Sequence, residues 1–148
     1  MAYSTVADVQ KLFANITFDG TTPVTDADIT NVHIPNADAY IDARLRRFYE
    51  TPITASGDLG LLRLISMNLA AGFVAEVLYE TSSQPNDQAS ARRHRETAER
   101  LLDGVLRGDL TLETARRPIA DAGVLADYEP LSDEERRIAP LVRLIEDH

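Results

Sequence analysis

The chain has 148 residues, which is long enough for one domain with a substantial hydrophobic core. Its composition is 44% hydrophobic and 26% charged, as in ordinary globular proteins, and its formal net charge is −9. This charge argues against a broad basic face that grips nucleic acid. The sequence contains no cysteine, which excludes disulfide frameworks and thiolate metal sites. The opening MAYSTVADVQ lacks a signal-peptide pattern, so we expect synthesis and residence in a cytoplasm.

The first helix is predicted from a local capping signal. Thr5–Asp8 has the spacing of a capping box, and apolar residues then recur at helical intervals. This pattern predicts a short helix over Thr5–Ala14. The following residues, Asn15–Pro23, are expected to form a connector with a turn at Asp19-Gly20.

A second capping signal, Thr25–Asp28, opens the next helical region. Pro35 interrupts it, and we expect either a kink near His33 or a new helix with Pro35 in its first turn. The helix is predicted to end near Tyr49, because the residue before Pro52 disfavours the helical region. The side chains expected on its polar side are Asp38, Asp42, Arg46 and Arg47.

The most informative segment is Leu61–Tyr79, in which fourteen of nineteen residues are hydrophobic. A helix that is apolar on almost every face has to be enclosed by other helices. Arg63, Asn68 and Glu76 are spread along the segment, which a bilayer would penalise, so we expect no membrane span. The segment is therefore predicted to be the central helix of a compact bundle, after a loop over Ile53–Gly60.

The last helix of the bundle is predicted to follow a polar loop at Thr81–Gln88. Apolar residues at helical spacing predict a helix over Ala89–Leu106, with Gly108 as its stop. Its outer side carries many charges, and Glu99 and Asp103 form an unfavourable pair of like charges one turn apart.

The character of the sequence changes after Leu112. Residues Glu113–Pro130 are polar and punctuated by proline and glycine, and Ser132–Glu135 has the spacing of a capping box. An amphipathic terminal helix is expected after it, with an apolar face formed by Ile138, Leu141, Val142 and Ile145. The predicted fold is all-α: a small helical bundle around a buried central helix (residues 1–112), with a C-terminal extension (residues 113–148) ending in the amphipathic helix.

Side chains that carry chemistry are scarce. The histidines His33, His94 and His148 have no metal-ligand spacing, and His94 is interpreted as an exposed helix residue. No nucleophile elbow or phosphate-binding glycine loop is present, and the acids at helix starts are interpreted as caps. We therefore predict no catalytic residue, no cofactor, no metal and no enzymatic activity.

Two features suggest a binding partner. The first is a dense set of arginines, interpreted either as solvated surface or as a charged face that meets another copy of the chain. The second is the C-terminal amphipathic segment, which either docks onto another protein or folds back onto its own bundle. The candidate partner-binding residues are Arg44, Arg47, Arg92, Arg93, Arg95, Ile138, Leu141, Val142 and Ile145.

The order of these segments resembles that of the small head–tail connector (adaptor, or head-completion) proteins of tailed bacteriophages. The resemblance covers roughly residues 3–112. It rests on YSTVADVQKLF, the Thr25–Asp28 cap, ADAYIDARLRRFY followed by Pro52, LLRLISMNLAAGFVAEVLYE, and ETAERLLDGVLRGDLTL. The residues after Leu112 have no counterpart in it, and Pro35 lies inside a region that looks helical in the family.

The resemblance implies a structural virion protein at the neck, present in the host cytoplasm during assembly. It implies a homo-oligomer, typically a dodecameric ring, that lies below the portal protein and extends the DNA channel. The ring would offer a docking platform to stopper or tail proteins, and DNA would pass through without sequence-specific binding. The acidic excess suits a channel wall that repels phosphates.

Two other classes of function remain. A small helical regulatory or protein-binding module would need an exposed recognition surface, and the net charge of −9 weighs against one that binds nucleic acid. An enzyme would need a pocket with convergent polar groups, and the sequence contains no motif that indicates such a pocket.

Overall fold

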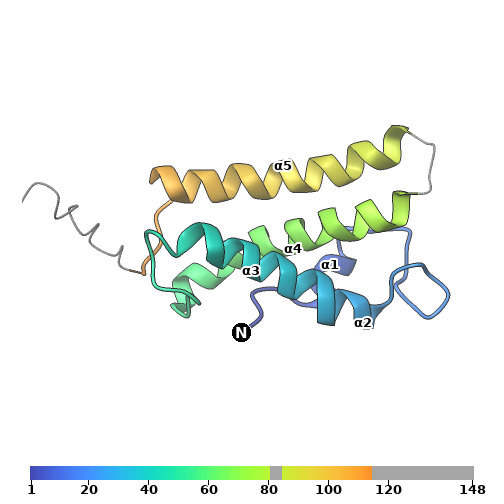
Figure 1. Ribbon diagram of the computed structural model, residues 1–148, viewed down its shortest axis with the longest axis horizontal. Coiled ribbons are helices and arrows are strands. Elements are labelled where there is room, and N and C mark those ends of the chain that lie inside the picture. Colours follow the sequence, from blue (N-terminus) through green and yellow to red (C-terminus); the bar gives the residue numbers. More distant parts are fainter. Residues whose placement is uncertain (81–84, 115–148) are drawn as a thin grey trace, which may run out of the picture. The chain divides into compact units, whose positions relative to one another are not determined.

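The protein is all-α in the computed structural model, which describes residues 1–80 and 85–114 (Figure 1). Within these ranges there is no strand, so the predicted fold class is confirmed. The elements are α1 (Val6–Gln10), α2 (Asp26–Asp28), a π-helical turn η1 (Ile29–His33), α3 (Ile34–Leu45), α4 (Ser56–Tyr79) and α5 (Pro85–Arg107). The chain divides into two units, Met1–Arg117 and Pro118–His148. The predicted terminal helix lies outside the described residues.

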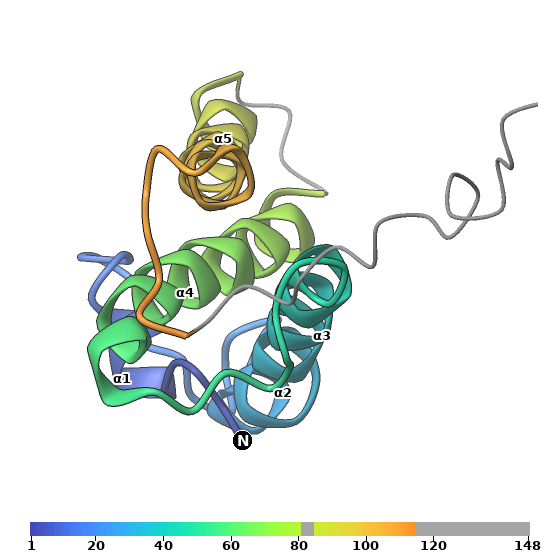
Figure 2. The ribbon, with the colours of Figure 1, turned by 90° about the vertical axis from the view of Figure 1, so that its left-hand side faces the viewer.

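Helix α4 is the centre of the helical unit, as its composition predicts. It contacts α1, η1, α3 and α5, and α3 and α5 both run antiparallel to it (Figures 1 and 2). Its buried apolar residues are Leu62, Ile65, Leu69, Ala70, Ala71, Val74 and Ala75. Helix α4 lies close to α5 at Gly72, where an added Cβ would lie 2.6 Å from Cγ of Arg95. A larger residue at position 72 would meet the Arg95 side chain, so Gly72 allows the two helices to pack closely.

The enclosure of α4 is less complete than predicted. Leu64 and Val77 are 39% and 42% exposed, because the neighbouring helices cover α4 on some sides only. Among the described residues, α4 is the helix that by length and composition could cross a membrane. However, 56% of its most apolar stretch is buried within the unit, as expected of a core helix.

Both predicted capping boxes at the starts of α1 and α2 are present. Helix α1 is nevertheless shorter than expected and ends at Gln10 instead of Ala14. The Gln10 amide donates hydrogen bonds to the carbonyls of Phe13 (3.2 Å) and Ile16 (2.5 Å). A side chain thus satisfies carbonyls in the turn that follows the short helix.

Pro35 lies in the first turn of α3, as in the second of the two predicted alternatives, and a π-helical turn precedes it in place of the predicted kink. The π-helical turn η1 widens the helix before it, with the Ile34 N–H bonded to the Ile29 carbonyl, and Pro35 then lies in the first turn of α3. A wider turn makes room for the proline ring, which an α-helical interior would not. Helix α3 ends at Leu45, although the Tyr49 N–H still bonds the Leu45 carbonyl at 2.9 Å.

Two helix starts lie earlier than the sequence predicts. Helix α4 begins at Ser56, so the expected loop over Ile53–Gly60 ends sooner, in spite of two glycines. Helix α5 begins at Pro85 and not at Ala89, since proline fits the first turn of a helix. The predicted stop at Gly108 is confirmed: its φ is 88°, and its N–H bonds the Gly104 carbonyl at 3.1 Å.

Candidate interaction surface

Arg44, a predicted partner-binding residue, makes its contacts within the chain and joins α3 to α5. Its guanidinium donates hydrogen bonds to the Asp103 carboxylate at 2.8 Å and to the Tyr40 hydroxyl at 3.1 Å. A second ion pair reaches Glu99 at 3.6 Å, and the Tyr40 hydroxyl donates to Glu99 at 2.5 Å. The predicted repulsion between Glu99 and Asp103 is therefore offset by a cation from another helix.

Arg95 also has internal contacts. Its guanidinium pairs with the Glu76 carboxylate of α4 and lies 5.3 Å from the centre of the Phe73 ring. Arg92 is exposed and lies beside it in an open groove of about 760 Å³ between α4 and α5. The groove is lined by Glu76, Val77, Arg92 and Arg95, among others, with charges of both signs. This lining is too mixed and open to point to one small-molecule ligand.

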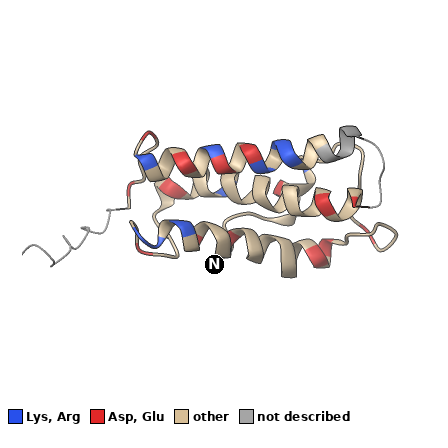
Figure 3. Ribbon diagram, turned by 45° about the horizontal axis from the view of Figure 1, so that its top comes forward, with Lys and Arg blue, Asp and Glu red and all other residues tan. Residues whose placement is uncertain are grey.

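Arg47 and Arg93 form no ion pair with a residue in the described ranges. Both are exposed, and Arg47 lies over the Phe48 ring at 5.5 Å from its centre. Arg44 lies in the last turn of α3 and Arg47 follows that helix, whereas Arg92, Arg93 and Arg95 lie in the first half of α5. Figure 3 shows the distribution of basic and acidic residues over these helices. Arg95 and Asp103, the partner of Arg44, are about 12 Å apart along the α5 axis. The structure thus divides the arginines between two places.

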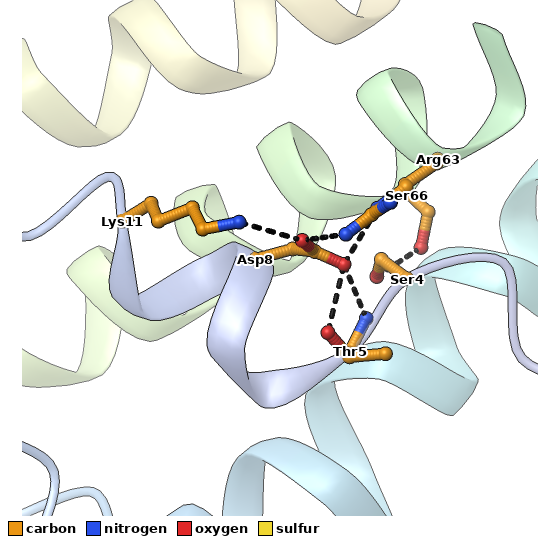
Figure 4. Close-up of polar contacts among 6 residues, drawn as sticks. All are labelled: Ser4, Thr5, Asp8, Lys11, Arg63 and Ser66. Carbon is orange, nitrogen blue, oxygen red and sulfur yellow. Dashed lines mark hydrogen bonds and ion pairs between the residues drawn. The ribbon is translucent and has the colours of Figure 1, made fainter. Parts of the chain in front are cut away.

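Sequence reasoning did not identify a polar junction between α1 and α4 (Figure 4). The Asp8 carboxylate is 3% exposed and accepts two hydrogen bonds from Arg63, one of them at 2.8 Å from Nε. It also accepts the N–H and hydroxyl of Thr5, at 3.0 and 2.8 Å. The hydrogen bonds from Arg63, and next those from Thr5, hold the pKa of Asp8 well below its usual range, against the opposing effect of burial.

A second junction attaches the N-terminal segment to α3. The backbone N–H of Tyr3 and the hydroxyl of Ser66 donate to the Asp38 carboxylate at 3.0 and 2.6 Å. The Tyr3 hydroxyl donates to Asp42 at 2.6 Å and accepts the N–H of Ile53 at 3.0 Å. Asp38 is buried, and not on an exposed polar side as predicted, because these partners come from distant parts of the chain. Burial raises the pKa values of Asp38 and Tyr3.

A third carboxylate fixes the chain that follows α5. Asp58, in the first turn of α4, accepts the N–H groups of Glu113 and Thr114 at 2.6 and 2.8 Å and the Thr114 hydroxyl at 2.5 Å. Burial favours a higher pKa of Asp58, but these three hydrogen bonds together lower it. These hydrogen bonds attach Glu113 and Thr114, the first residues after the predicted boundary at Leu112, to α4. An acidic residue in the first turn of a helix can be recognised from the sequence, but the distant residues that it binds cannot.

The two histidines that the structure describes, His33 and His94, are both wholly or partly buried. His94 is half-buried and not exposed as predicted: its Nδ1 lies 3.2 Å from the Asn68 side-chain oxygen, and its ring packs near Phe13. Burial lowers the pKa values of His33 and His94. In residues 1–80 and 85–114, no three His, Asp or Glu side chains are grouped so as to hold a metal ion. Ile138, Leu141, Val142 and Ile145 lie outside the described residues.

No family model, curated protein or solved structure matches the chain.

Proposed function

We propose that this protein is a head–tail connector, or adaptor, of a tailed bacteriophage. In this role it forms a ring below the portal protein, extends the DNA channel and provides the docking platform for stopper or tail proteins. The observation that carries the proposal is the order of its segments: a capped first helix, a helix followed by Arg-Phe-Tyr and Pro52, the central helix α4, and α5 ending at Arg107 before Gly108.

The way in which the helices are tied together supports a structural role. Asp8 joins α1 to α4, Asp38 joins the N-terminal segment to α3 and α4, and Arg44 joins α3 to α5. Satisfied polar networks of this kind hold elements in one arrangement. A block that keeps its shape suits a ring subunit, because each copy must present the same surfaces to its neighbours.

The charges of the subunit suit a DNA channel. With a net charge of −9, the acidic surfaces repel phosphates and let DNA slide past. We expect acidic faces to line the channel. An assembled ring whose lumen is lined by the arginines would contradict this part of the proposal.

The test is to add the purified protein to tailless, DNA-filled heads of its own phage and to image the portal vertex. The expected result is a ring of added density below the portal, with its symmetry visible. Failure to bind the vertex, with the protein remaining monomeric, would refute the adaptor role. Heads that already carry the adaptor are the control, because their vertex is occupied.

The alternative is a small helical regulatory or protein-binding module. The observation in its favour is that Arg92 and Arg93 are exposed on one helix. Gene neighbourhood separates the two functions, since an adaptor gene is expected between capsid and tail genes. A pull-down of partners from host extract would identify a regulatory target.

A further inference from the structure

Three arginines form a straight line on the outer face of α5. Arg93, Arg100 and Arg107 are spaced by seven residues, which brings them to nearly the same side of an α-helix. All three are exposed, and the line is about 21 Å long. The opposite side of the helix is buried through Ala98, Leu102 and Val105, among others. We call Arg93, Arg100 and Arg107 the α5 arginine stripe.

The stripe differs from the arginines that hold the fold together. Arg44, Arg63 and Arg95 each pair with a carboxylate of another helix. None of the three stripe guanidinium groups forms an ion pair or side-chain hydrogen bond with a residue in the described ranges. The contacts within the described unit therefore account for the first set of arginines and leave the stripe available for a partner.

The described unit also carries a surface of opposite sign. From Leu12 to Ala43 the sequence contains no lysine or arginine. Three exposed carboxylates lie at one end of the unit, Asp19 in its turn and Asp26 and Asp28 in α2 (Figure 3). We call Asp19, Asp26 and Asp28 the acidic end.

The carboxylates of the acidic end have free capacity to accept hydrogen bonds. Asp19 uses Oδ1 for Thr21, at 2.8 and 2.6 Å, and Asp28 uses Oδ2 for Thr25, at 2.9 and 2.7 Å. The second oxygen of each accepts no hydrogen bond from the part of the chain that the structure describes. A carboxylate has about four acceptor positions, so each can still receive a guanidinium.

We propose that the α5 arginine stripe of one copy binds the acidic end of a second copy of this chain. The inference rests on the proposed function and deepens it, since it names the surfaces that join neighbouring subunits. The two surfaces differ, so the contact is heterologous and repeats head to tail, which closes a ring when the rotation allows. Exposed ion pairs are individually weak, and the contact is therefore expected to be salt-sensitive and to gain strength from repetition around the ring.

The absence of cysteine makes a direct test possible, because disulfides form only between thiols that are introduced. Glu96→Cys places a thiol between Arg93 and Arg100, and Ala27→Cys places one between Asp26 and Asp28; both positions are exposed. The two variants, one of which carries a mass tag, are mixed under mild oxidation. The experiment is done once in concentrated solution and once on tailless heads. Glu96→Cys mixed with Thr54→Cys, also exposed, is the matched control.

The expected result is a mixed disulfide between Glu96→Cys and Ala27→Cys in excess of the control pair. Its yield should fall to the control level in about 1 M salt, where the screening length is about 3 Å. A yield no higher than the control, both in solution and on the heads, would overturn the proposal.

Charge reversal then tests the named residues. Adding Arg93→Glu and Arg100→Glu to the Glu96→Cys variant should reduce the mixed disulfide to the control level, whereas Arg46→Glu, at an exposed position on another segment, should not. Adding Asp26→Arg to the Ala27→Cys partner should restore part of the yield. An unchanged yield after reversal of the stripe would refute the contact.

The two proposals can fail separately. If the disulfide forms but the protein does not bind the vertex, the contact between copies stands and the adaptor function fails. If the protein binds the vertex but no disulfide forms there, the adaptor function stands and the contact between the stripe and the acidic end is refuted.

Discussion

Arg63 of α4 donates two hydrogen bonds to the buried carboxylate of Asp8 in α1, across 55 positions of sequence. The pair fixes the first helix to the central helix, and it does so at an edge of the unit where Arg63 is 52% exposed. Together with the hydrogen bond from the Tyr3 N–H to Asp38, it attaches the first residues of the chain to the core.

Asp8→Asn should destabilise the protein at neutral pH. The amide keeps the size of the carboxylate but loses its charge, and the expected loss is about 1–2 kcal/mol, at the low end because Arg63 is half exposed. The lowered pKa of Asp8 means that its contribution is present above the usual carboxyl range and is lost as pH falls. Urea unfolding at neutral and acidic pH measures both effects. Lys11→Ala, 3.6 Å from Asp8 and largely exposed, is the control and should change little.

Asp38→Asn should change the pH dependence in the opposite sense. Because burial raises the pKa of Asp38, the folded state holds its proton more tightly than the unfolded chain, and stability falls as pH rises through the interval between the two pKa values. Asparagine has no proton to lose. The free energy of unfolding of the variant, relative to the parent, should therefore improve as the pH is raised from about 4. A relative stability that is constant with pH would contradict the assignment, and the exposed Asp26→Asn is the matched control.

Arg44→Ala should weaken the junction between α3 and α5. It removes the cation that separates Glu99 from Asp103, and because its side chain is 38% exposed we expect a loss of about 0.5–1 kcal/mol. A double-mutant cycle with Asp103→Ala isolates the pair, and its coupling energy should shrink with added salt. Arg46→Ala, exposed and only two positions away, should leave stability unchanged. Equal effects of the two substitutions would show that Arg44 has no special role.

Asp58→Ala should release the chain after α5. The variant loses the acceptor of three hydrogen bonds, so amide exchange at Glu113 and Thr114 should accelerate. Since these hydrogen bonds lower the pKa of Asp58, the parent should show the same acceleration, beyond the intrinsic pH effect, when the carboxyl is protonated in acid. Asp109→Ala, at an exposed position in the same segment, is the control. Unchanged exchange at both amides would mean that other contacts hold the segment.

The sequence predicted what depends on neighbours within a few residues. The capping boxes at Thr5 and Thr25, the place of Pro35 and the stop at Gly108 were all recognisable, because their hydrogen bonds and steric limits act within about one helical turn. The central helix was recognisable from composition alone, since so apolar a segment has to be covered.

The predictions from the sequence were wrong where the environment of a side chain depends on residues far away along the chain. The sequence placed Asp38 on a polar side and His94 in solvent, but their partners, Tyr3 and Asn68, lie 35 and 26 positions away. The Glu99–Asp103 pair looked unfavourable until α3 supplied Arg44. Helix α4 begins at Ser56 in spite of its glycines, where Asp58 binds the segment at Glu113–Thr114.

The arginines of the candidate interaction surface also show which features depend on local sequence and which depend on tertiary structure. By itself, the sequence determined that the protein is a helical bundle with one central helix and a dense set of arginines, and it contained no recognisable catalytic motif. Only the tertiary structure decided which arginines are used inside the fold, as Arg44 and Arg95 are, and which remain exposed along α5. The physical reason is range: backbone hydrogen bonds and side-chain sterics act locally, whereas the pairing of a charge depends on which helices packing brings together.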